Sequence, residues 1–458
     1  MRKKEFIMKS NDPKNRFFKA FLIKIPLRKL SKESNFCKRK PKKIYPQNLI
    51  VGFFLMVSNS GTHSFQHWAS KIGLLTGKTI SKQALWKRMN QDMILFLQKV
   101  LSSSLANSME KSTISRISKR LKVFKNIFLE DSTHIQVDGR LAKFYPGNKY
   151  AGARGGESEK AIVKLHVIYN LTKTRFEQFM ISNFRKSDCR SAEDILEIAR
   201  AGDLILRDLG FCVLAVYKIF ISRGIYFISR LKGGTNIYLT KEAENPINLA
   251  KMLRKRGQLD LTAFTWAEER VQVKIIALPV EESVASERRR KLKQDRNKRY
   301  RPNKEKLFIL GWEIFITNVE NDKLEARDIA SIYFLRWRIE ILFKCWKSHM
   351  KIDQVPHSGN RQQLEAYIYC MLIYIVIIQV GLYHYHLSYE IHILKHAEVS
   401  DISIMKFTQL VFENGVELIL SEFKRFVFTP GAFEKQILYH SRYEIRNDRK
   451  NFIQKSNF

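Results

Sequence analysis

Cysteine is scarce in this chain, and its few cysteines are scattered. The 458 residues include five cysteines, an odd number. None forms a Cys-x-x-Cys pair or a Cys/His cluster with zinc spacing, so the sequence supports neither a disulfide framework nor structural zinc. This usage is typical of a reducing cytosol. The cysteines are Cys37, Cys189, Cys212, Cys345 and Cys370.

Acidic residues are also few relative to basic ones. Asp and Glu total 44 against 81 Lys and Arg, which gives a formal net charge of +37. A chain this basic is expected to bind a polyanion, with DNA or RNA as the leading partner. An anionic membrane surface is the rival partner. It is disfavoured because the charge is spread over the whole length rather than confined to one amphipathic helix.

A long apolar run is lacking as well. The longest, Ala366–Val380, is shorter than the ~20 residues of a membrane-spanning helix and contains tyrosine and glutamine. We predict a buried core helix there and no membrane partner. The basic N-terminus offers no clean signal peptide, because Phe17–Leu27 is interrupted by lysine and proline. We therefore expect a cytoplasmic protein.

The most informative residues lie between Ser331 and Met350. On one α-helix, the spacing of Tyr333, Arg336, Glu340 and Lys347 would bring these side chains within about 60° of one another. The rest of the segment is mostly apolar, which favours a buried helix with one polar stripe. A carboxylate between cations suits a metal ligand beside a phosphate. A solvated helix face with an Arg–Glu pair is the alternative, and spacing alone leaves both open.

The same spacing carries a family resemblance. Tyr-(2)-Arg-(3)-Glu-(6)-Lys resembles the YREK signature of DDE transposases from bacterial insertion sequences, the insertion-sequence-4-like family, and matches it without a departure. The resemblance implies two upstream aspartates, each at the end of a β-strand. Asp131 follows the apolar segment from Phe124 and opens Asp-Ser-Thr, while Asp208 opens Asp-Leu-Gly. Both look like the corresponding family blocks.

Each aspartate has a plainer interpretation and a local competitor. An Asp before Gly at a strand end is most often a turn residue. Glu130 would face the opposite side of the strand from Asp131, because side chains alternate along a strand. Asp203 precedes its strand instead of ending it.

The segments around these aspartates predict a mixed α/β, ribonuclease-H-like sheet. Both aspartates are expected at the carboxyl ends of strands, where sites of α/β sheets are usually built. The predicted elements are strands at Phe124–Asp131, Ala161–Tyr169, Phe176–Ile181 and Ile225–Leu231, and helices at Ser191–Ala199 and Val213–Ser222.

The long separation of Asp208 from Glu340 implies an insertion in this domain. We predict strands at Leu259–Phe264 and Val271–Leu278, a basic phosphate-binding arm at Ser286–Arg301, and a returning strand at Leu307–Thr317. The expected domains are a helical, basic, DNA-binding N-terminal domain (1–120), a catalytic domain (121–232 and 307–385), a mostly β insertion (233–306) and a C-terminal helical region (386–458).

Two further groups of residues are candidate DNA contacts. A turn, a Ser81 cap and a short helix resemble a helix-turn-helix recognition helix, although many ordinary capped helices look the same. The side chains on its exposed edge are Lys82, Gln83, Lys87 and Arg88. The resemblance also implies an insertion tryptophan that stacks on or stabilises a flipped base. Trp266 and Trp312 are the candidates, with a core role as the alternative for each.

The resemblance implies a transposase that binds terminal inverted repeats, cleaves the ends and joins them to target DNA. Asp131, Asp208 and Glu340 would hold two Mg²⁺ ions, with Mn²⁺ as a substitute, for two-metal phosphoryl transfer. Tyr333, Arg336 and Lys347 would grip phosphates of double-stranded DNA. Family members act as homodimers in a synaptic complex, so we expect a homodimer in the bacterial cytoplasm, associated with the nucleoid. Two alternatives stay open: an inactive or domesticated DNA-binding relative, and a ribonuclease-H-like nuclease without strand transfer.

Overall fold

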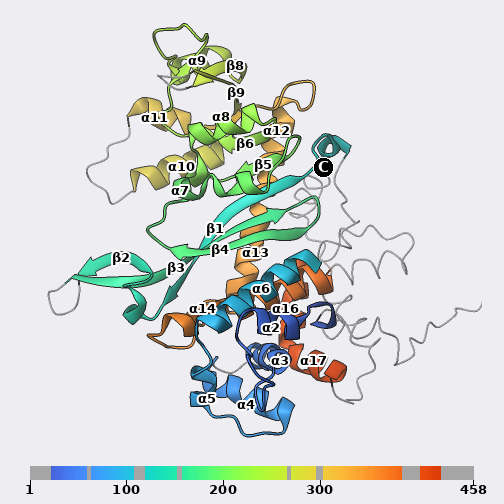
Figure 1. Ribbon diagram of the computed structural model, residues 1–458. Coiled ribbons are helices and arrows are strands. Elements are labelled where there is room, and N and C mark those ends of the chain that lie inside the picture. Colours follow the sequence, from blue (N-terminus) through green and yellow to red (C-terminus); the bar gives the residue numbers. More distant parts are fainter. Residues whose placement is uncertain are drawn as a thin grey trace, which may run out of the picture.

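The structure is a computed structural model that describes residues 22–58, 63–107, 119–151, 157–265, 270–294, 303–383 and 403–423. A long sheet occupies the middle of the molecule (Figure 1). The N-terminal helices gather at one end together with the last helices of the described chain. The segment predicted as an insertion lies at the opposite end.

The sheet is mixed, as the sequence predicts. Ten strands follow the order β2-β3-β1-β5-β6-β10-β9-β8-β7, with β4 paired to β3. β1 pairs parallel with β5 and β5 parallel with β6, whereas the other pairings are antiparallel. The strands are β1 Ile127–Val137, β2 Pro146–Ala151, β3 Glu157–Asn170, β4 Arg175–Asn183, β5 Leu204–Arg207, β6 Tyr226–Arg230, β7 Ile237–Tyr238, β8 Leu259–Thr265, β9 Val271–Pro279 and β10 Trp312–Thr317.

Helices cover both faces of this sheet. Leu129 and its neighbours on one face join a core with α13 and α14, while Phe128 and its neighbours join a second core with α8. The helices are α2 Leu27–Glu33, α3 Pro46–Val57, α4 Phe65–Thr76, α5 Lys82–Trp86, α6 Gln91–Asn107, α7 Asp188–Ser191, α8 Leu214–Ser222, α9 Leu249–Arg256, α10 Glu282–Lys293, α11 Lys304–Ile309, α12 Ala326–Tyr333, α13 Trp337–Ser348, α14 Arg361–Ile375, α16 Ile404–Glu413 and α17 Gly415–Phe423.

The predicted core helix is confirmed in α14 and the π-helical turn that follows it, Val376–Leu382. In the described part of the chain, Arg361–Leu382 is the one helix long and apolar enough to cross a membrane, and 89% of its apolar window is buried inside the protein. The N-terminal helices pack on it. Phe53 meets Tyr367 at a ring distance of 5.4 Å, and Phe54 stacks on Tyr374 at 4.5 Å.

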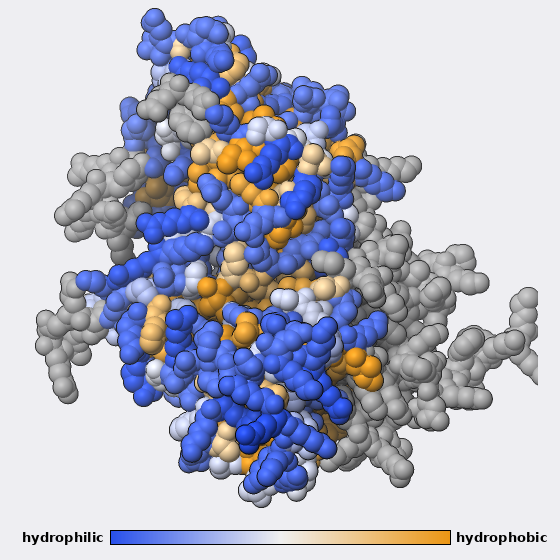
Figure 2. Space-filling view, in the orientation of Figure 1, coloured by the Kyte–Doolittle hydropathy of each residue, from blue (hydrophilic) through white to orange (hydrophobic). Residues whose placement is uncertain are grey.

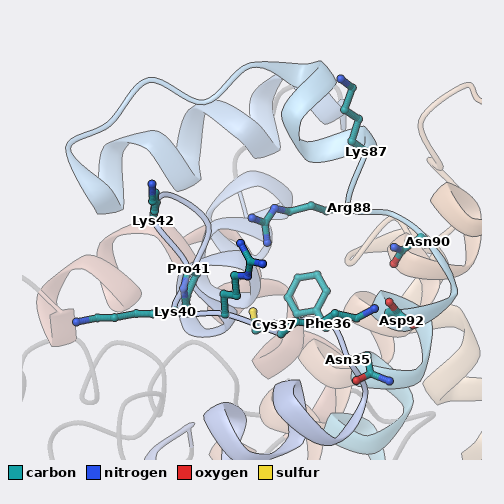
Figure 3. A pocket seen from close by; sticks show the side chains of 12 residues that line it. Asn35, Phe36, Cys37, Lys40, Pro41, Lys42, Lys87, Arg88, Asn90 and Asp92 are labelled. Atoms are coloured by element: carbon teal, nitrogen blue, oxygen red, sulfur yellow. The ribbon is translucent and has the colours of Figure 1, made fainter.

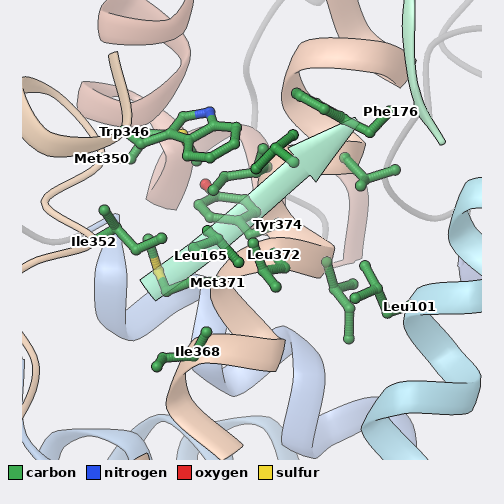
Figure 4. Packing of buried hydrophobic residues seen from close by; sticks show 14 of the residues in the cluster. Leu101, Leu165, Phe176, Trp346, Met350, Ile352, Ile368, Met371, Leu372 and Tyr374 are labelled. Atoms are coloured by element: carbon green, nitrogen blue, oxygen red, sulfur yellow. The ribbon is translucent and has the colours of Figure 1, made fainter. Parts of the chain in front are cut away.

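These contacts join the N-terminal helices and the sheet through one hydrophobic core. Figure 4 shows Tyr374, Met371 and Leu372 of α14 close to Trp346 and Phe176. On the outside, hydrophilic residues cover most of the N-terminal end in the view of Figure 2. In the described chain most apolar residues are thus buried, while most lysines and arginines lie at the surface.

Most predicted elements near the aspartates are confirmed. β3 and β4 form the expected hairpin, whose turn contains Thr174 at φ 47°. α8 begins after Val213 and is followed by β6. β8 and β9 match the two strands predicted in the insertion. The basic run contributes to α10, and its remainder, Asp295–Arg301, lies outside the described residues.

Two element predictions are wrong. Ser191–Ala199 is not a helix: α7 ends at Ser191, and only a 3-10 turn, Asp194–Glu197, follows. The Ala192 carbonyl there accepts from the Arg207 side chain, and the Leu196 N–H, which an α-helix would direct to Ala192, donates to the Glu193 carbonyl instead. Leu307–Thr317 is not one strand, because an Asn303 side-chain cap starts α11 and β10 begins only at Trp312.

The insertion is also not mostly β. α9 and α10 contain about as many residues as its strands. α9 starts from an Asn248 cap, and α10 is supported by a Glu287–Lys291 pair one helical turn apart. Its strands continue the central sheet, since β9 pairs with β10 and β10 with β6.

We predict that Trp346→Ala destabilises the protein by about 3–5 kcal/mol, the usual cost of deleting a buried large aromatic side chain. Trp346 is fully buried, its ring lies 5.6 Å from that of Phe176, and its indole N–H donates to Gln379 at 2.8 Å. Urea unfolding measures the effect. The control is Trp337→Ala, whose side chain is 53% exposed and should cost less than about 0.5 kcal/mol. Equal unfolding midpoints for the two variants would contradict the core assignment.

Candidate active site

Asp131 lies on β1, but not at the end of the strand. The parallel pairing of β1 with β5 ends at Glu130 opposite Arg207, while its antiparallel pairing with β3 continues to Val137. The prediction of a strand-terminal Asp131 is therefore wrong, because β3 is long enough to extend β1. Asp131 is the first residue beyond the parallel pairing. Glu130 is fully buried on the opposite face, as predicted.

Asp208 directly follows β5, as predicted, and has extended dihedral angles. A 3-10 turn, Leu209–Phe211, then carries the chain away from the sheet. Gly210 permits a close approach there: a Cβ at this position would lie 2.9 Å from Oδ2 of Asp188. The glycine after this aspartate therefore has a packing reason. Asp203, the local competitor, instead accepts hydrogen bonds from Asn126 and from the backbone of Arg200.

Glu340 lies on α13, which passes beneath β1 (Figure 1). Ser331–Met350 is not the single α-helix predicted, because α12 ends at Tyr333 and a 3-10 turn, Phe334–Arg336, precedes α13. The tighter turn accompanies a buried Tyr333, whose ring lies 5.3 Å from that of Phe315. The backbone remains right-handed helical through the turn, so Arg336 still reaches Glu340.

Arg336 joins two of the three predicted acids. Its Nη1 lies 3.2 Å from Oδ2 of Asp131, and its Nη2 lies 2.7 Å from Oε1 of Glu340. The arginine is buried, whereas the Glu340 side chain is 41% exposed. A residue of the 3-10 turn, one of β1 and one of α13 are thereby fixed to one another.

Asp208, the third predicted acid, interacts electrostatically with the same site. Burial, together with the carboxylates of Asp208 and Glu340, raises the pKa of Asp131 to about 6, while the Ser132 N–H and Arg336 act to lower it. Burial acts to lower the pKa of Arg336. Tyr333 and the three acids outweigh that effect and leave this pKa raised. Asp208 and Glu340 are therefore both close enough to act on Asp131 and Arg336.

The donor set fits a hard divalent cation, because it consists of carboxylate oxygens. The raised pKa of Asp131 also shows a site in which negative charge is costly. In the described part of the chain, however, no group of three His, Cys, Asp or Glu side chains is close enough to hold a metal ion. The guanidinium of Arg336 contacts two of the acids, so a cation would compete with it for them.

Lys347 lies near His134, three residues after Asp131 on β1. Burial lowers the pKa of His134, and Lys164 and Lys347 lower it further. Lys164 is a buried lysine of β3 whose Nζ lies 2.6 Å from Oδ1 of Asp188. The Ser132 hydroxyl donates to the same carboxylate at 3.0 Å. Sequence reasoning missed Lys164 and Asp188, although a lysine within an apolar strand was a usable signal.

The candidate DNA contacts of the N-terminal region surround a helix of only five residues. The Ser81 cap of α5 is confirmed, since its side chain accepts from the Ala84 N–H. Lys82 lies 4.3 Å above the Trp86 ring and lines one hollow, of about 1000 Å³. Lys87 and Arg88 line a different hollow, of about 710 Å³. Gln83 is exposed at the start of the helix.

The structure describes only one of the two candidate tryptophans. Trp266 lies outside the described residues. Trp312 opens β10 and is partly buried, with its ring 6.1 Å from that of Phe308. This placement favours the core role that the sequence left open for Trp312.

We predict that Asp131→Asn removes a pH dependence of stability. A carboxyl group whose pKa is higher in the folded than in the unfolded chain favours folding below about pH 4, and this contribution is lost as pH rises through about 6. The wild-type protein should therefore lose about 2–3 kcal/mol over this range from this group, whose side chain is 16% exposed. Unfolding at pH 4.5 and 7.5 measures it, with the exposed Asp322→Asn as control. An unchanged pH profile in Asp131→Asn would contradict the prediction.

Comparison with known proteins agrees with this geometry. Residues 123–375 match the family described as "Transposase DDE domain", a range that contains all three acids. The chain is 30% identical over 374 residues to the transposase for insertion sequence element IS231C of Bacillus thuringiensis subsp. berliner, covering 77% of this chain and 76% of that protein.

Other relatives match over a similar span. The chain is 27% identical over 367 residues to the transposase for insertion sequence element IS231F of Bacillus thuringiensis subsp. israelensis, covering 76% of this chain and 75% of the relative. It is 24% identical over 367 residues to the transposase for insertion sequence element IS1151 of Clostridium perfringens, covering 76% of each. Since the family match spans more than half of its length, the chain belongs to the transposase DDE domain family.

Proposed function

We propose that the chain is an active DNA transposase of the YREK, insertion-sequence-4-like type. It binds the terminal inverted repeats of its element, cleaves the ends and joins them to target DNA. The observation that carries the proposal is the bridge from Asp131 through Arg336 to Glu340, with Asp208 within electrostatic reach. The relatives named as insertion-sequence transposases support the same activity.

The proposed architecture is ribonuclease-H-like. The catalytic domain comprises 121–232 and 307–385, interrupted by the insertion 233–306. Residues 1–120 act as the DNA-binding domain, and 386–458 form a C-terminal helical region. The parallel β1-β5-β6 core with α8 on one face and α13 on the other supports this assignment.

Asp131, Asp208 and Glu340 would hold two Mg²⁺ ions, for which Mn²⁺ can substitute. When bound, such ions polarise the phosphoryl group and stabilise the attacking and leaving oxygens. Before binding, Arg336 balances the charge of Asp131 and Glu340. Arg336 and Lys347 would then hold phosphate oxygens of the DNA end, since Arg336 contacts Asp131 and Glu340 and Lys347 follows Glu340 on α13 and lies near His134 of β1. Tyr333 supports Arg336 from the core, with the guanidinium 5.8 Å from its ring.

A basic hollow supports DNA binding by the N-terminal region. Its cations are Lys38, Arg39, Lys40, Lys42, Lys87 and Arg88, and Asp92 is the one acid of its lining. Within the described residues, no ion pair neutralises any of these cations. Figure 3 shows Lys40, Lys42 and Lys87 extending outward while Arg88 reaches across the loop. Unpaired cations in a concave surface suit the phosphates of double-stranded DNA.

The protein would act as a homodimer in a synaptic complex, in the cytoplasm and on the nucleoid. Two other functions remain distinguishable by experiment. An inactive or domesticated relative would bind DNA without cleaving it. A ribonuclease-H-like nuclease would cleave DNA without joining it.

We predict that Asp131→Asn, Asp208→Asn and Glu340→Gln each reduce end cleavage and strand transfer by at least about 100-fold, because each would remove a metal ligand worth several kcal/mol in the transition state. The assay uses a plasmid carrying the gene with its flanking DNA, in Mg²⁺, and monitors cleaved and joined products by gel. Glu320→Gln, an exposed acid, is the control and should retain activity.

Each possible result of this assay has a distinct meaning. Loss of both products in the three variants supports transposition. Binding without cleavage by the wild-type protein indicates a domesticated relative. Cleavage without joining indicates a nuclease, and retained activity in any of the three variants contradicts the assigned site.

We predict that Lys40→Ala/Lys87→Ala lowers the slope of log affinity against log salt by about 2, since each phosphate contact contributes about 0.9. Fluorescence anisotropy with a labelled duplex of the flanking DNA measures this slope between about 50 and 200 mM salt. Lys218→Ala/Arg223→Ala removes the same charge from exposed positions at α8 and should change the slope little. Equal slopes for the two double variants would exclude the hollow as a DNA contact.

A further inference from the structure

Each of the two aspartates directly follows a charged residue, and these two preceding residues have opposite charges. Glu130 precedes Asp131 on β1, and Arg207 precedes Asp208 on β5. Glu130 and Arg207 are direct partners in the parallel register, and they form the last pair before the strands separate. A pair of oppositely charged residues is therefore the last pair between β1 and β5, directly before Asp131 and Asp208.

This pair is completely buried. Glu130 and Arg207 are both 0% exposed, and Oε2 of Glu130 lies 2.5 Å from Nη2 of Arg207. His166 of β3 approaches from the other side, with its Nε2 3.1 Å from Oε1 of Glu130. The cluster thus spans three adjacent strands, β3, β1 and β5.

Arg207 also holds the turn that follows Asp208. Its Nη1 donates to the Phe211 carbonyl at 3.4 Å, and its Nη2 donates to the Ala192 carbonyl at 3.1 Å. The Phe211 ring stacks on His166 at 5.2 Å. The backbone on both sides of Asp208 is therefore tied to the cluster.

The cluster and the acids lie on opposite faces of the sheet. Phe128 and Ile205 share the face of Glu130 and Arg207, and both belong to the core under α8. Asp131 points the other way, toward Arg336. Because neighbouring residues on a strand share a peptide unit, the separation of Glu130 and Arg207 sets the separation of the residues that follow them.

A gain in folding stability is a weak explanation for a buried ion pair at this position. A well-packed apolar pair is often as stabilising as a buried ion pair, or more so. Moreover, the buried Nε of Arg207 has no hydrogen-bond partner among the described residues, and the buried Nδ1 of His166 lies 3.7 Å from Oδ2 of Asp194, beyond hydrogen-bond distance. The cluster leaves polar atoms unsatisfied, which a purely structural element would avoid.

We propose that Glu130, Arg207 and His166 form a positioning cluster that sets the spacing of Asp131 and Asp208, and with it the affinity of the site for divalent cations. This inference rests on the proposed function, because it takes the two aspartates as metal ligands. Outer groups that orient metal ligands commonly change metal affinity 10- to 100-fold when removed.

The test compares full-length wild-type protein with Glu130→Gln and with Glu130→Gln/Arg207→Met. Bound Mn²⁺ is measured by electron paramagnetic resonance without DNA, thermal stability by calorimetry, and the Mg²⁺ dependence of cleavage on the plasmid described above. Glu130→Gln should lower both stability and Mn²⁺ affinity, the latter at least about 10-fold. The double variant removes the unpaired buried charge, so it should regain stability while Mn²⁺ affinity stays low.

Glu177→Gln is the matched control, because Glu177 forms a buried ion pair with Arg175 on β4 at 2.9 Å. It should lower stability without changing Mn²⁺ affinity. Recovery of Mn²⁺ affinity together with stability in the double variant would reduce the cluster to a structural role and overturn the inference. A wild-type protein that neither binds Mn²⁺ nor cleaves DNA would overturn the proposed function as well. Unchanged Mn²⁺ affinity in Glu130→Gln, with an active wild-type protein, overturns the positioning role alone.

Discussion

The ionic bridge through Arg336 is the constraint on which the site depends. Asp131 and Glu340 are far apart in the sequence and lie on a strand and a helix that meet only in the folded protein. The Arg336 guanidinium forms ion pairs with both carboxylates, and its own charge is buried. The bridge keeps two acids together that would otherwise repel each other. It also places a permanent cation between two of the proposed metal ligands, so under the proposed function metal binding would require Arg336 to release them.

The rest of the fold holds this bridge in place. β1 pairs with β3 on one side and with β5 on the other. α13 packs on the sheet through a hydrophobic core that includes Trp346 and α14. The N-terminal helices pack on α14 as well, through Phe53 and Phe54. A rigid core therefore connects the proposed DNA-binding region to the acids. Most lysines and arginines of the described chain lie at the surface, where the proposed function would use them to bind phosphates.

The sequence predicted the parts of the site that depend on local spacing. The Tyr333–Lys347 pattern located the helical segment, and the apolar run before Asp208 located its strand. The rest depends on tertiary partners that no local pattern reveals. The end of β1 was misplaced because the length of β3 decides it, and the 3-10 turn before α13 was missed because Tyr333 packs into the core. Asp188 and Lys164 meet the site only through the folding of β3 and α7 around it.

The central claim is that Asp131, Asp208 and Glu340 bind divalent cations together once Arg336 no longer contacts Asp131 and Glu340. Anomalous X-ray scattering from crystals of the protein grown with Mn²⁺ and its DNA end tests this most directly. The account predicts manganese peaks within about 2.0–2.6 Å of oxygens from all three acids, with Arg336 turned from Asp131 toward a phosphate. Manganese bound elsewhere, or not at all, with the Asp131–Arg336–Glu340 bridge still intact, would contradict it.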